Sequence, residues 1–413
     1  MTGEISTDDI EDGGPAIRRD DWRVLLGVYW VTSFIEAATF SQVLAFLPSY
    51  LKQMGVAEAE RLRFVGLFGA LVFIVGAPLV PLWGVWADKY SRKAVIIRSA
   101  LVEAVVFTAI ALSRTPTQLA FSMLLIGLQL GNTGVMLAAI RDVTPRKRLG
   151  TAIALFGASG AVGFAAGPAF GGWLIDGQGM SISFMYAVSA ILSLGAAALL
   201  AVGSREVRPT VVPQGSAVGL AVQALRSVLS EPTTRRIFTL FGVAVLATQM
   251  TRPYVPVLVE RLAGQGPGLA SAIALVVGTA ALAGALVSPL GGAIGDRIGF
   301  RPVLITALLG SGVAVGMMPF MPTVRTLAIL ALGFAACQAA VSAMVFGMIA
   351  TEVPPERRSA TINLVYLPLY ATGIIGPIVG AAIVPWGVGA VFAVGAGVLG
   401  GGVGVVGGGV RGG

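Results

Sequence analysis

The sequence contains no histidine, only one cysteine and few charged residues, and each shortage excludes a class of protein. Without histidine, no imidazole proton relay and no His-ligated metal can form. Cys337 alone can make neither an intrachain disulfide nor a cysteine cluster. Only 12% of the residues are charged, against about 25% in soluble domains, and 56% are apolar. We therefore expect an integral membrane protein that holds no metal and no cofactor.

Nucleotide and nucleic-acid sites are also poorly supported. Glycine precedes none of the four lysines, which excludes the Gly-x-x-x-x-Gly-Lys loop of ATP-driven pumps. The stretch Gly395-x-Gly397-x-x-Gly400 fits a dinucleotide pattern, but it lies in an apolar run without a following acidic residue. The net charge of +8 is spread over short loops instead of one face, which argues against nucleic acid as a partner. No enzymatic activity is expected.

Twelve apolar runs follow a polar start, most of them close to the ~20 residues that span a bilayer as a helix. They are 24–50, 63–87, 94–113, 117–140, 150–175, 182–202, 236–260, 269–293, 302–320, 325–349, 358–384 and 386–408. This pattern predicts an N-terminal tail at 1–22, a six-helix bundle at 23–202, a linker at 203–235, a second six-helix bundle at 236–408 and a tail at 409–413. A surface helix is expected near 218–230.

The distribution of Lys and Arg predicts the orientation. With both termini in the cytoplasm, 20 of these residues lie on the cytoplasmic side and 7 on the outer side, as the positive-inside rule requires. Residues 4–21 carry seven acidic residues, the wrong charge for the start of a secretory signal. The first helix is therefore expected to be an uncleaved insertion signal. We expect a multi-pass protein of the cytoplasmic membrane.

Three motifs occur twice, in the same order. The turn from Gly84 through Asp88 to Lys93 returns after 208 residues as 292–301, 142–151 returns after 210 as 352–361, and 167–171 returns after 209 as 376–380. A nearly constant offset indicates two parallel repeats, an architecture of transporters whose site lies between the halves. The expected fold is all-α, with twelve transmembrane helices in two pseudo-symmetric six-helix bundles.

At this point the chain resembles the major facilitator superfamily, and within it the twelve-helix drug/proton antiporter branch of multidrug-efflux type. The turn Gly84-x-x-x-Asp88-x-x-x-Arg92-Lys93 is similar to the superfamily's loop motif. The glycine run from Gly157 to Gly172 is similar to the helix-5 motif of exporters. The resemblance implies export of small lipophilic or amphipathic molecules by proton antiport with alternating access.

The sequence departs from the family pattern at two places, and two other functions are alternatives to this interpretation. The stretch 125–131 lacks the arginine that exporters usually carry in helix 4, and Phe300 stands in the second loop copy where Arg92 stands in the first. The alternatives are a proton-coupled importer or facilitator of a small nutrient, such as a sugar or organic acid, and a non-transporting membrane sensor or scaffold.

The loop motif is expected to gate transport. An ion pair of Asp88 that forms in one state and breaks in another could act as a latch, and the resemblance implies that it closes against helix 11. Gly84 is expected to allow close helix approach. The gating set is Gly84, Asp88, Arg92, Lys93, Asp296, Arg301, Arg357 and Arg358. The alternative is that the basic residues only set topology.

A packing face is expected on helix 5. Gly163, Gly167 and Gly171 recur every four residues and so share one face, where small side chains allow close packing. Pro168 can bend the helix, and Gly172 completes the motif. The resemblance implies that this face packs on helix 8 along Gly278, Ala281 and Ala285. Generic packing in a glycine-rich protein is the alternative.

Glu36 is the strongest candidate for proton coupling or substrate contact. It lies near the middle of the first apolar run, where a carboxylate is costly and usually marks a pathway or polar cavity. A static polar brace is the alternative. Arg98 and Glu103 lie five residues apart, ~140° around a helix, and are not expected to pair. Arg98 is expected to reach the cytoplasmic surface. Either Glu36 or Glu103 could carry the proton.

Polar residues recur on the other helices that the resemblance places around a cavity. The complete coupling and substrate set is Glu36, Gln129, Asn132, Met136, Gln249, Arg252, Gln338, Asn363 and Tyr366. Gln129, Asn132 and Met136 are expected on one helix face. Such a lining suits amphipathic cargo, although each residue could instead make an interhelical hydrogen bond. The expected partners are a small molecule, protons and membrane lipid, and the expected state is a monomer.

Overall fold

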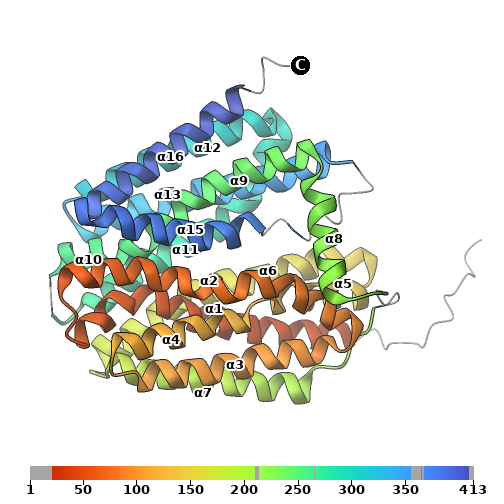
Figure 1. Cartoon of the computed structure of the whole chain (residues 1–413), viewed down its shortest axis with the longest axis horizontal. Helices are drawn as coiled ribbons and strands as arrows, with labels where there is room; N and C mark the ends of the chain where they lie inside the picture. Colours follow the sequence, from red (N-terminus) through yellow and green to blue (C-terminus); the bar gives the residue numbers. More distant parts are fainter. Residues whose placement is uncertain (1–20, 210–213, 265, 355–363, 365–366, 409–413) are drawn as a thin grey trace, which may run out of the picture.

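The computed structural model describes residues 21–209, 214–264, 266–354, 364 and 367–408, and it forms two bundles of helices (Figure 1). In Figure 1 the first half of the chain lies below and the second half above, with helices of both halves running roughly horizontally. The helix α8 (Ala217–Leu229) stands at one side and connects the two bundles. It is the surface helix expected near 218–230.

The first half contains six helical segments. They are α1 (Asp21–Gln53); α2 (Glu58–Lys89); α3 (Arg92–Leu112); α4 (Pro116–Ile126) with η1 (Gly127–Gln129) and α5 (Asn132–Val143); η2 (Arg146–Arg148) with α6 (Leu149–Gly172) and η3 (Trp173–Gly177); and α7 (Ile182–Gly203).

The second half repeats this pattern. Its segments are α9 (Pro232–Thr251) with η4 (Arg252–Tyr254) and α10 (Val255–Ala263); α11 (Leu269–Ile298); α12 (Phe300–Met317) with η5 (Met318–Phe320); α13 (Val324–Glu352); α15 (Leu367–Ile383) with η6 (Val384–Trp386); and α16 (Val388–Gly408). The start of the run predicted at 358–384 lies outside the described residues.

The segments have the length and composition of membrane spans. Within the described residues, nine helices are long and apolar enough to cross a bilayer, and 269–284 and 388–404 form shorter apolar stretches. The chain is therefore an integral, multi-pass membrane protein, and the predicted all-α fold of two six-helix bundles is confirmed. An α-helix satisfies its own backbone hydrogen bonds, which lipid cannot do.

Short polar side chains fix where several helices begin. Ser91, Thr115 and Ser181 each accept a hydrogen bond from the backbone nitrogen three residues later, at the starts of α3, α4 and α7. Thr323 and Thr326 form a reciprocal capping box at the start of α13. These caps satisfy backbone donors that the first turn of a helix leaves free.

The fourth segment is broken, although an uninterrupted helix was expected over 117–140. The helix tightens at η1, and Gly131 then adopts a φ of +99° before α5 begins. Glycine reaches this left-handed conformation without the penalty that a Cβ imposes. The break changes which residues of this segment share a face.

The two ends of the molecule differ. We call the end with α8 and the α2–α3 turn the linker end, and the end with the α1–α2 and α10–α11 turns the opposite end.

The two halves contact each other closely near the opposite end. A Cβ added to Gly66 of α2 would stand 2.6 Å from the Tyr254 hydroxyl and 2.8 Å from the Pro377 carbonyl oxygen, both in the second half. Helices α6 and α11 also pack across the halves. Small residues make such close contacts possible.

Candidate functional site

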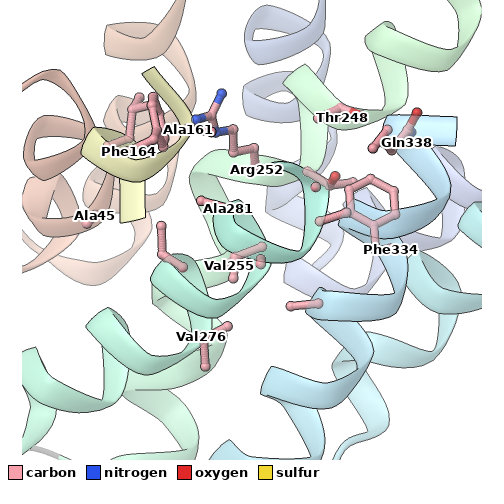
Figure 2. A pocket seen from close by; sticks show the side chains of 18 of the residues that line it. Ala45, Ala161, Phe164, Thr248, Arg252, Val255, Val276, Ala281, Phe334 and Gln338 are labelled. Carbon is pink, nitrogen blue, oxygen red and sulfur yellow. The ribbon is translucent and has the colours of Figure 1, made fainter. Parts of the chain in front are cut away.

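A cavity of about 480 Å³ lies between the two bundles (Figure 2). We call it the central cavity. Its walls come from α1, α6, α9, η4, α10, α11, η5 and α13, so both halves contribute. Its lining includes Leu44, Ala45, Gly160, Ala161, Phe164, Thr248, Arg252, Val276, Ala281, Phe334 and Gln338. The wall is mainly apolar with a few polar groups, the composition of many small-molecule sites.

Arg252 is the charged group of this wall. It lies at the start of η4, where Pro253 and Pro256 remove backbone donors and the helix tightens into a 3₁₀ turn. Its guanidinium carbon lies 4.5 Å from the ring centroid of Phe164, which belongs to the other half. Figure 2 shows the two side chains facing each other. A guanidinium over an aromatic face is a favourable cation–π contact.

Three neutral polar side chains of the central cavity each donate one hydrogen bond to a backbone carbonyl. The Gln338 amide donates to the Ala244 carbonyl at 3.2 Å, and the Thr248 hydroxyl donates to the same oxygen at 3.3 Å. The Thr251 hydroxyl donates to the Ala247 carbonyl at 2.8 Å. The guanidinium of Arg252 and the second amide hydrogen of Gln338 are the donors of this wall that remain for a bound molecule.

The expected coupling and substrate residues are divided among separate places. Arg252 and Gln338 line the central cavity. Gln249 is buried and packs against Gly376. A Cβ added to Gly376 would stand 2.9 Å from the Cβ of Gln249. Asn363 and Tyr366 lie outside the described residues.

Glu36 lies in a second, much smaller cavity inside the first bundle, which we call the carboxylate pocket. Its lining is Thr32, Glu36, Ile96, Ala100, Glu103, Asn132, Met136, Ala196 and Leu200. The Asn132 amide donates to both oxygens of Glu36, at 2.8 and 2.9 Å. The Thr39 hydroxyl donates to Glu103 at 2.6 Å. The volume, about 10 Å³, is about that needed for one water molecule.

This placement corrects the expectation for Glu36. Glu36 was expected in the cavity between the halves, but it faces α3, α5 and α7 within its own half, because α1 turns its Leu44–Ala45 side to the central cavity instead. Glu103, the other residue that could carry the proton, lines the same pocket. The broken fourth segment separates Gln129, which is buried beside α3, from Asn132 and Met136, which line the pocket.

Arg98 occupies the break in the fourth segment. Its Nη2 lies 3.3 Å from the Leu130 carbonyl oxygen, and the Ser99 hydroxyl donates to the Gln129 carbonyl at 2.6 Å. The guanidinium carbon lies 3.8 Å from the ring centroid of Trp83. Arg98 therefore does not reach for the surface as expected, because the freed carbonyls and the indole ring hold it inside the bundle.

The loop motif at the linker end is tied to its own half. Arg92 has only 2% of its side chain exposed and forms ion pairs with Asp88 and Asp142, each at 2.7 Å. Glu206 accepts hydrogen bonds from the Ser91 hydroxyl and the Arg92 backbone. The Lys93 amine donates to the carbonyls of Ala201 and Ser204 at the end of α7, where a cation is favourable.

The remaining gating residues have different surroundings from those expected. Within the described residues, no neighbouring atom outside its own helix lies within 4 Å of where a Gly84 Cβ would stand, so the expected close approach at Gly84 is wrong. Asp296 and Arg301 are exposed in the second copy of the loop. Arg357 and Arg358, the expected partners on helix 11, lie outside the described residues.

The glycines of α6 face a different helix from the one expected. A Cβ on Gly163 would meet the Phe34 carbonyl oxygen, and one on Gly167 would meet that of Ala38, so this face packs on α1. Gly171 packs against Phe46 and Met185. Pro168 is buried on the same helix.

The seam with α11 uses the other side of α6. A Cβ on Gly172 would lie 3.1 Å from the Ala270 carbonyl oxygen, and one on Gly278 would lie 3.1 Å from that of Ala165. Residue 165 is about 200° around the helix from 167, so the two faces point in opposite directions. Helix α6 thus lies between α1 and the second half.

The opposite end carries an ion cluster that the sequence interpretation missed. Arg61 of α2 donates to Glu260 of α10 at 3.0 Å, and both side chains are almost fully buried. Lys52 lies 3.6 Å from Glu260, and Arg261 lies 3.7 Å from Glu58. The Ser271 backbone nitrogen donates to Asp176 at 2.7 Å nearby. Each of these contacts joins the two halves.

Comparisons with known proteins agree with this architecture. A family model described as Major Facilitator Superfamily matches residues 29–273 and 268–407. "Multidrug resistance protein MdtG" of Citrobacter koseri is 29% identical over 384 residues, which cover 92% of this chain and 93% of that protein. The protein of the same name from Salmonella typhi has the same identity and coverage.

Solved structures share the fold. A mutant of the nucleoside transporter NupG aligns with a TM-score of 0.78 at 15% identity, over 92% of this chain and 98% of that one. The human organic anion transporter MFSD10 aligns with a TM-score of 0.67 at 17% identity, over 93% of this chain and 99% of that one. At these identities the likeness concerns the arrangement of the helices.

Proposed function

The chain belongs to the Major Facilitator Superfamily, and from this premise we propose that it exports small lipophilic or amphipathic molecules by proton antiport with alternating access. It is a membrane transporter and not an enzyme. The observation that carries the proposal is the central cavity, because its mainly apolar wall is built by both halves and is large enough for a drug-sized molecule. The name of the MdtG proteins, which match nearly the full length of the chain, supports multidrug export.

The arrangement of the interdomain contacts supports alternating access. The seam between α6 and α11 runs from Ala165 and Gly278 to Gly172 and Ala270, and the ion cluster around Glu260 closes the opposite end. Gly160 and Gly284 line the central cavity on the linker side of this seam. We assign the linker end to the cytoplasm, on the positive-inside count, so this arrangement corresponds to the inward-facing state.

The carboxylate pocket is our candidate for proton coupling. Two carboxylates at this depth in a membrane protein are costly and usually functional. Asn132 and Thr39 orient them, and Met136 and the small cavity leave little room for more than one water molecule. We assign the proton to the pair Glu36 and Glu103 together, because both side chains line one pocket.

The loop motif is our candidate for the linker-end gate. In the inward-facing state Asp88 pairs with Arg92, which Asp142 also holds. When the linker end closes, Asp88 would pair instead with a group of the second half, and Arg357 and Arg358 are the proposed partners. We further propose a monomer in the cytoplasmic membrane with both termini in the cytoplasm, and retain 23–202 and 236–408 as the two moving bundles.

Transport by everted membrane vesicles tests the proposal. The vesicles would be loaded with acid buffer and given ethidium, 8-anilinonaphthalene-1-sulfonate or a neutral dye, with vesicles lacking the protein as control. Uptake that requires the acid interior and stops with an uncoupler is the expected result for an exporter. Uptake driven by the reverse gradient would instead indicate an importer. Absence of flux across a chemically wide panel would indicate a sensor or scaffold.

A further inference from the structure

Resting on the proposed transport through the central cavity, we infer that this cavity selects amphipathic anions. Arg252 binds the carboxylate or sulfonate of the cargo, and the apolar wall binds its ring system. This deepens the proposed function by naming a substrate class.

The first observation is a cation without a counter-ion. Arg252 lines the central cavity, and in the described part of the chain its charged group contacts the Phe164 ring and forms no ion pair. None of the described residues that line the cavity is Asp or Glu. A cationic cargo would therefore meet repulsion without a compensating carboxylate.

The second observation is where the nearby carboxylates are engaged. Glu36 and Glu103 lie in the carboxylate pocket inside the first bundle, bound by Asn132 and Thr39. Glu260 is bound by Arg61 at the opposite end. These acidic groups have their own partners, so they leave the charge of Arg252 available to a ligand.

Desolvation explains why an anion should bind. An isolated charge in apolar surroundings is unfavourable, and a ligand that brings the opposite charge removes that cost. A guanidinium offers a planar fork that fits a carboxylate with two parallel hydrogen bonds. The Thr248 and Thr251 hydroxyls and one amide hydrogen of Gln338 are directed to backbone carbonyls, so the guanidinium is the charged donor among the described residues that line the cavity.

The rest of the cavity wall indicates what the uncharged part of the cargo is. Phe164 and Phe334 offer two aromatic side chains, and Ala161, Val276 and Ala281 complete an apolar surface. A fused-ring body can stack on the phenyl groups while its anionic group faces Arg252. The Arg252–Phe164 contact also joins the two halves, so an anion that draws the guanidinium away from the ring would loosen a contact between them.

A matched set of probes tests this inference without relying on transport. Binding of 2-naphthoate, 2-naphthamide and 2-naphthylmethylammonium would be measured by equilibrium dialysis against the full-length protein in phosphatidylcholine nanodiscs. The rings are the same and only the charge differs. We expect the carboxylate to bind at least about tenfold more tightly than the ammonium, which corresponds to one charge-assisted interaction.

Variants locate the effect. Arg252→Gln should remove the preference for the carboxylate and leave amide binding unchanged, whereas Arg252→Lys should retain part of the preference because it keeps the charge. Arg325→Gln, at an exposed position outside the cavity, is the matched control and should leave all three affinities unchanged. The comparison of probes on the unmodified protein stands even if Arg252→Gln fails to fold.

The outcomes separate this inference from the proposed function. Equal binding of the three probes, tighter binding of the ammonium, binding of none of them, or an unchanged preference in Arg252→Gln would overturn the inference. Proton-linked export of a cationic or neutral dye would still support the proposed function. Conversely, a carboxylate preference that depends on Arg252, without proton-linked flux, would support the binding site and refute antiport.

Discussion

Arg61 and Glu260 lie 199 residues apart in the chain, yet their side chains form a buried ion pair at 3.0 Å that joins α2 of one half to α10 of the other. Buried charges resist separation because each would be left without a partner. Lys52, at 3.6 Å from Glu260, provides a second, more exposed cation. The opposite end is therefore closed by electrostatics as well as by packing.

Neutralising Glu260 should open this end. Glu260→Gln leaves Arg61 and Lys52 without their anion, so the state open at the opposite end should become more populated. Arg61→Gln should have a smaller effect, because Lys52 remains beside Glu260. We would place Ala335→Cys in the central cavity on a Cys337→Ser background and measure its labelling by an impermeant maleimide from the outer face. We expect labelling about tenfold faster in Glu260→Gln, a modest share of the ~3–5 kcal/mol that a broken buried pair costs.

The control for this prediction is Arg63→Gln, which changes an exposed arginine two residues from Arg61. Its labelling rate should equal that of the parent. Equal rates in Glu260→Gln and the parent would mean that the cluster does not hold the end closed.

Arg92 should matter more for stability than either of its carboxylate partners. Arg92→Gln leaves Asp88 and Asp142 without their shared cation, whereas Asp88→Asn keeps the pair of Arg92 with Asp142. We expect a loss of about 1–3 kcal/mol for Arg92→Gln, since both carboxylates are partly exposed, and a smaller loss for Asp88→Asn.

Thermal unfolding of the purified protein in detergent would measure these losses. Lys147→Gln, an exposed basic residue at the linker end, serves as the control. A larger loss in Asp88→Asn than in Arg92→Gln would contradict the arrangement described for this loop.

Glu36 should be required for coupling but not for binding. Because it lies in the carboxylate pocket and not in the central cavity, Glu36→Gln should abolish accumulation driven by a pH gradient while retaining exchange of labelled for unlabelled substrate at equal concentrations. Glu103→Gln should weaken accumulation as well, since the two carboxylates share one pocket.

Proteoliposomes allow both measurements on one preparation. Glu60→Gln removes an exposed carboxylate outside both cavities and should change neither activity. If Glu36→Gln kept gradient-driven accumulation, the carboxylate would have to be regarded as a structural brace. If it lost exchange as well, a direct role in substrate binding would have to be reconsidered.

Replacing a glycine of α6 by alanine should have different effects at packed and unpacked positions. A Cβ on Gly167 would meet the Ala38 carbonyl oxygen and the Ser41 hydroxyl, whereas one on Gly157 would meet no neighbour within 4 Å. We expect Gly167→Ala to lower stability by about 3 kcal/mol, because α1 and α6 would have to separate. Gly157→Ala should be neutral or slightly stabilising, since alanine favours a helix. Equal unfolding temperatures in the two variants would refute the described packing.

Much of the fold followed from the sequence because its signals are local or periodic. Apolar runs the length of a bilayer gave the helices, and the repeated turn at Gly84 and 292–301 gave the two halves. These features depend on composition and on a constant spacing. Neither requires knowledge of which helices are neighbours.

The site was harder to predict because its arrangement depends on contacts between helices. The spacing of Gly163, Gly167 and Gly171 identified a shared face but not that the face meets α1. Gln129 and Asn132 were assigned to one face on the assumption of an unbroken helix, and the left-handed Gly131 removed that assumption. The pairing of Arg61 with Glu260 follows no repeat offset and has no local signature.

Helix α1 presents Glu36 to the carboxylate pocket and Leu44 to the central cavity, and this has a consequence for how such a protein could evolve. Substitutions in the cavity wall can alter which molecules are accepted without touching the residues that orient Glu36. The range of substrates and the proposed proton coupling can then change independently, although both depend on α1. Related proteins could thus come to export different compounds while keeping the same proposed proton coupling.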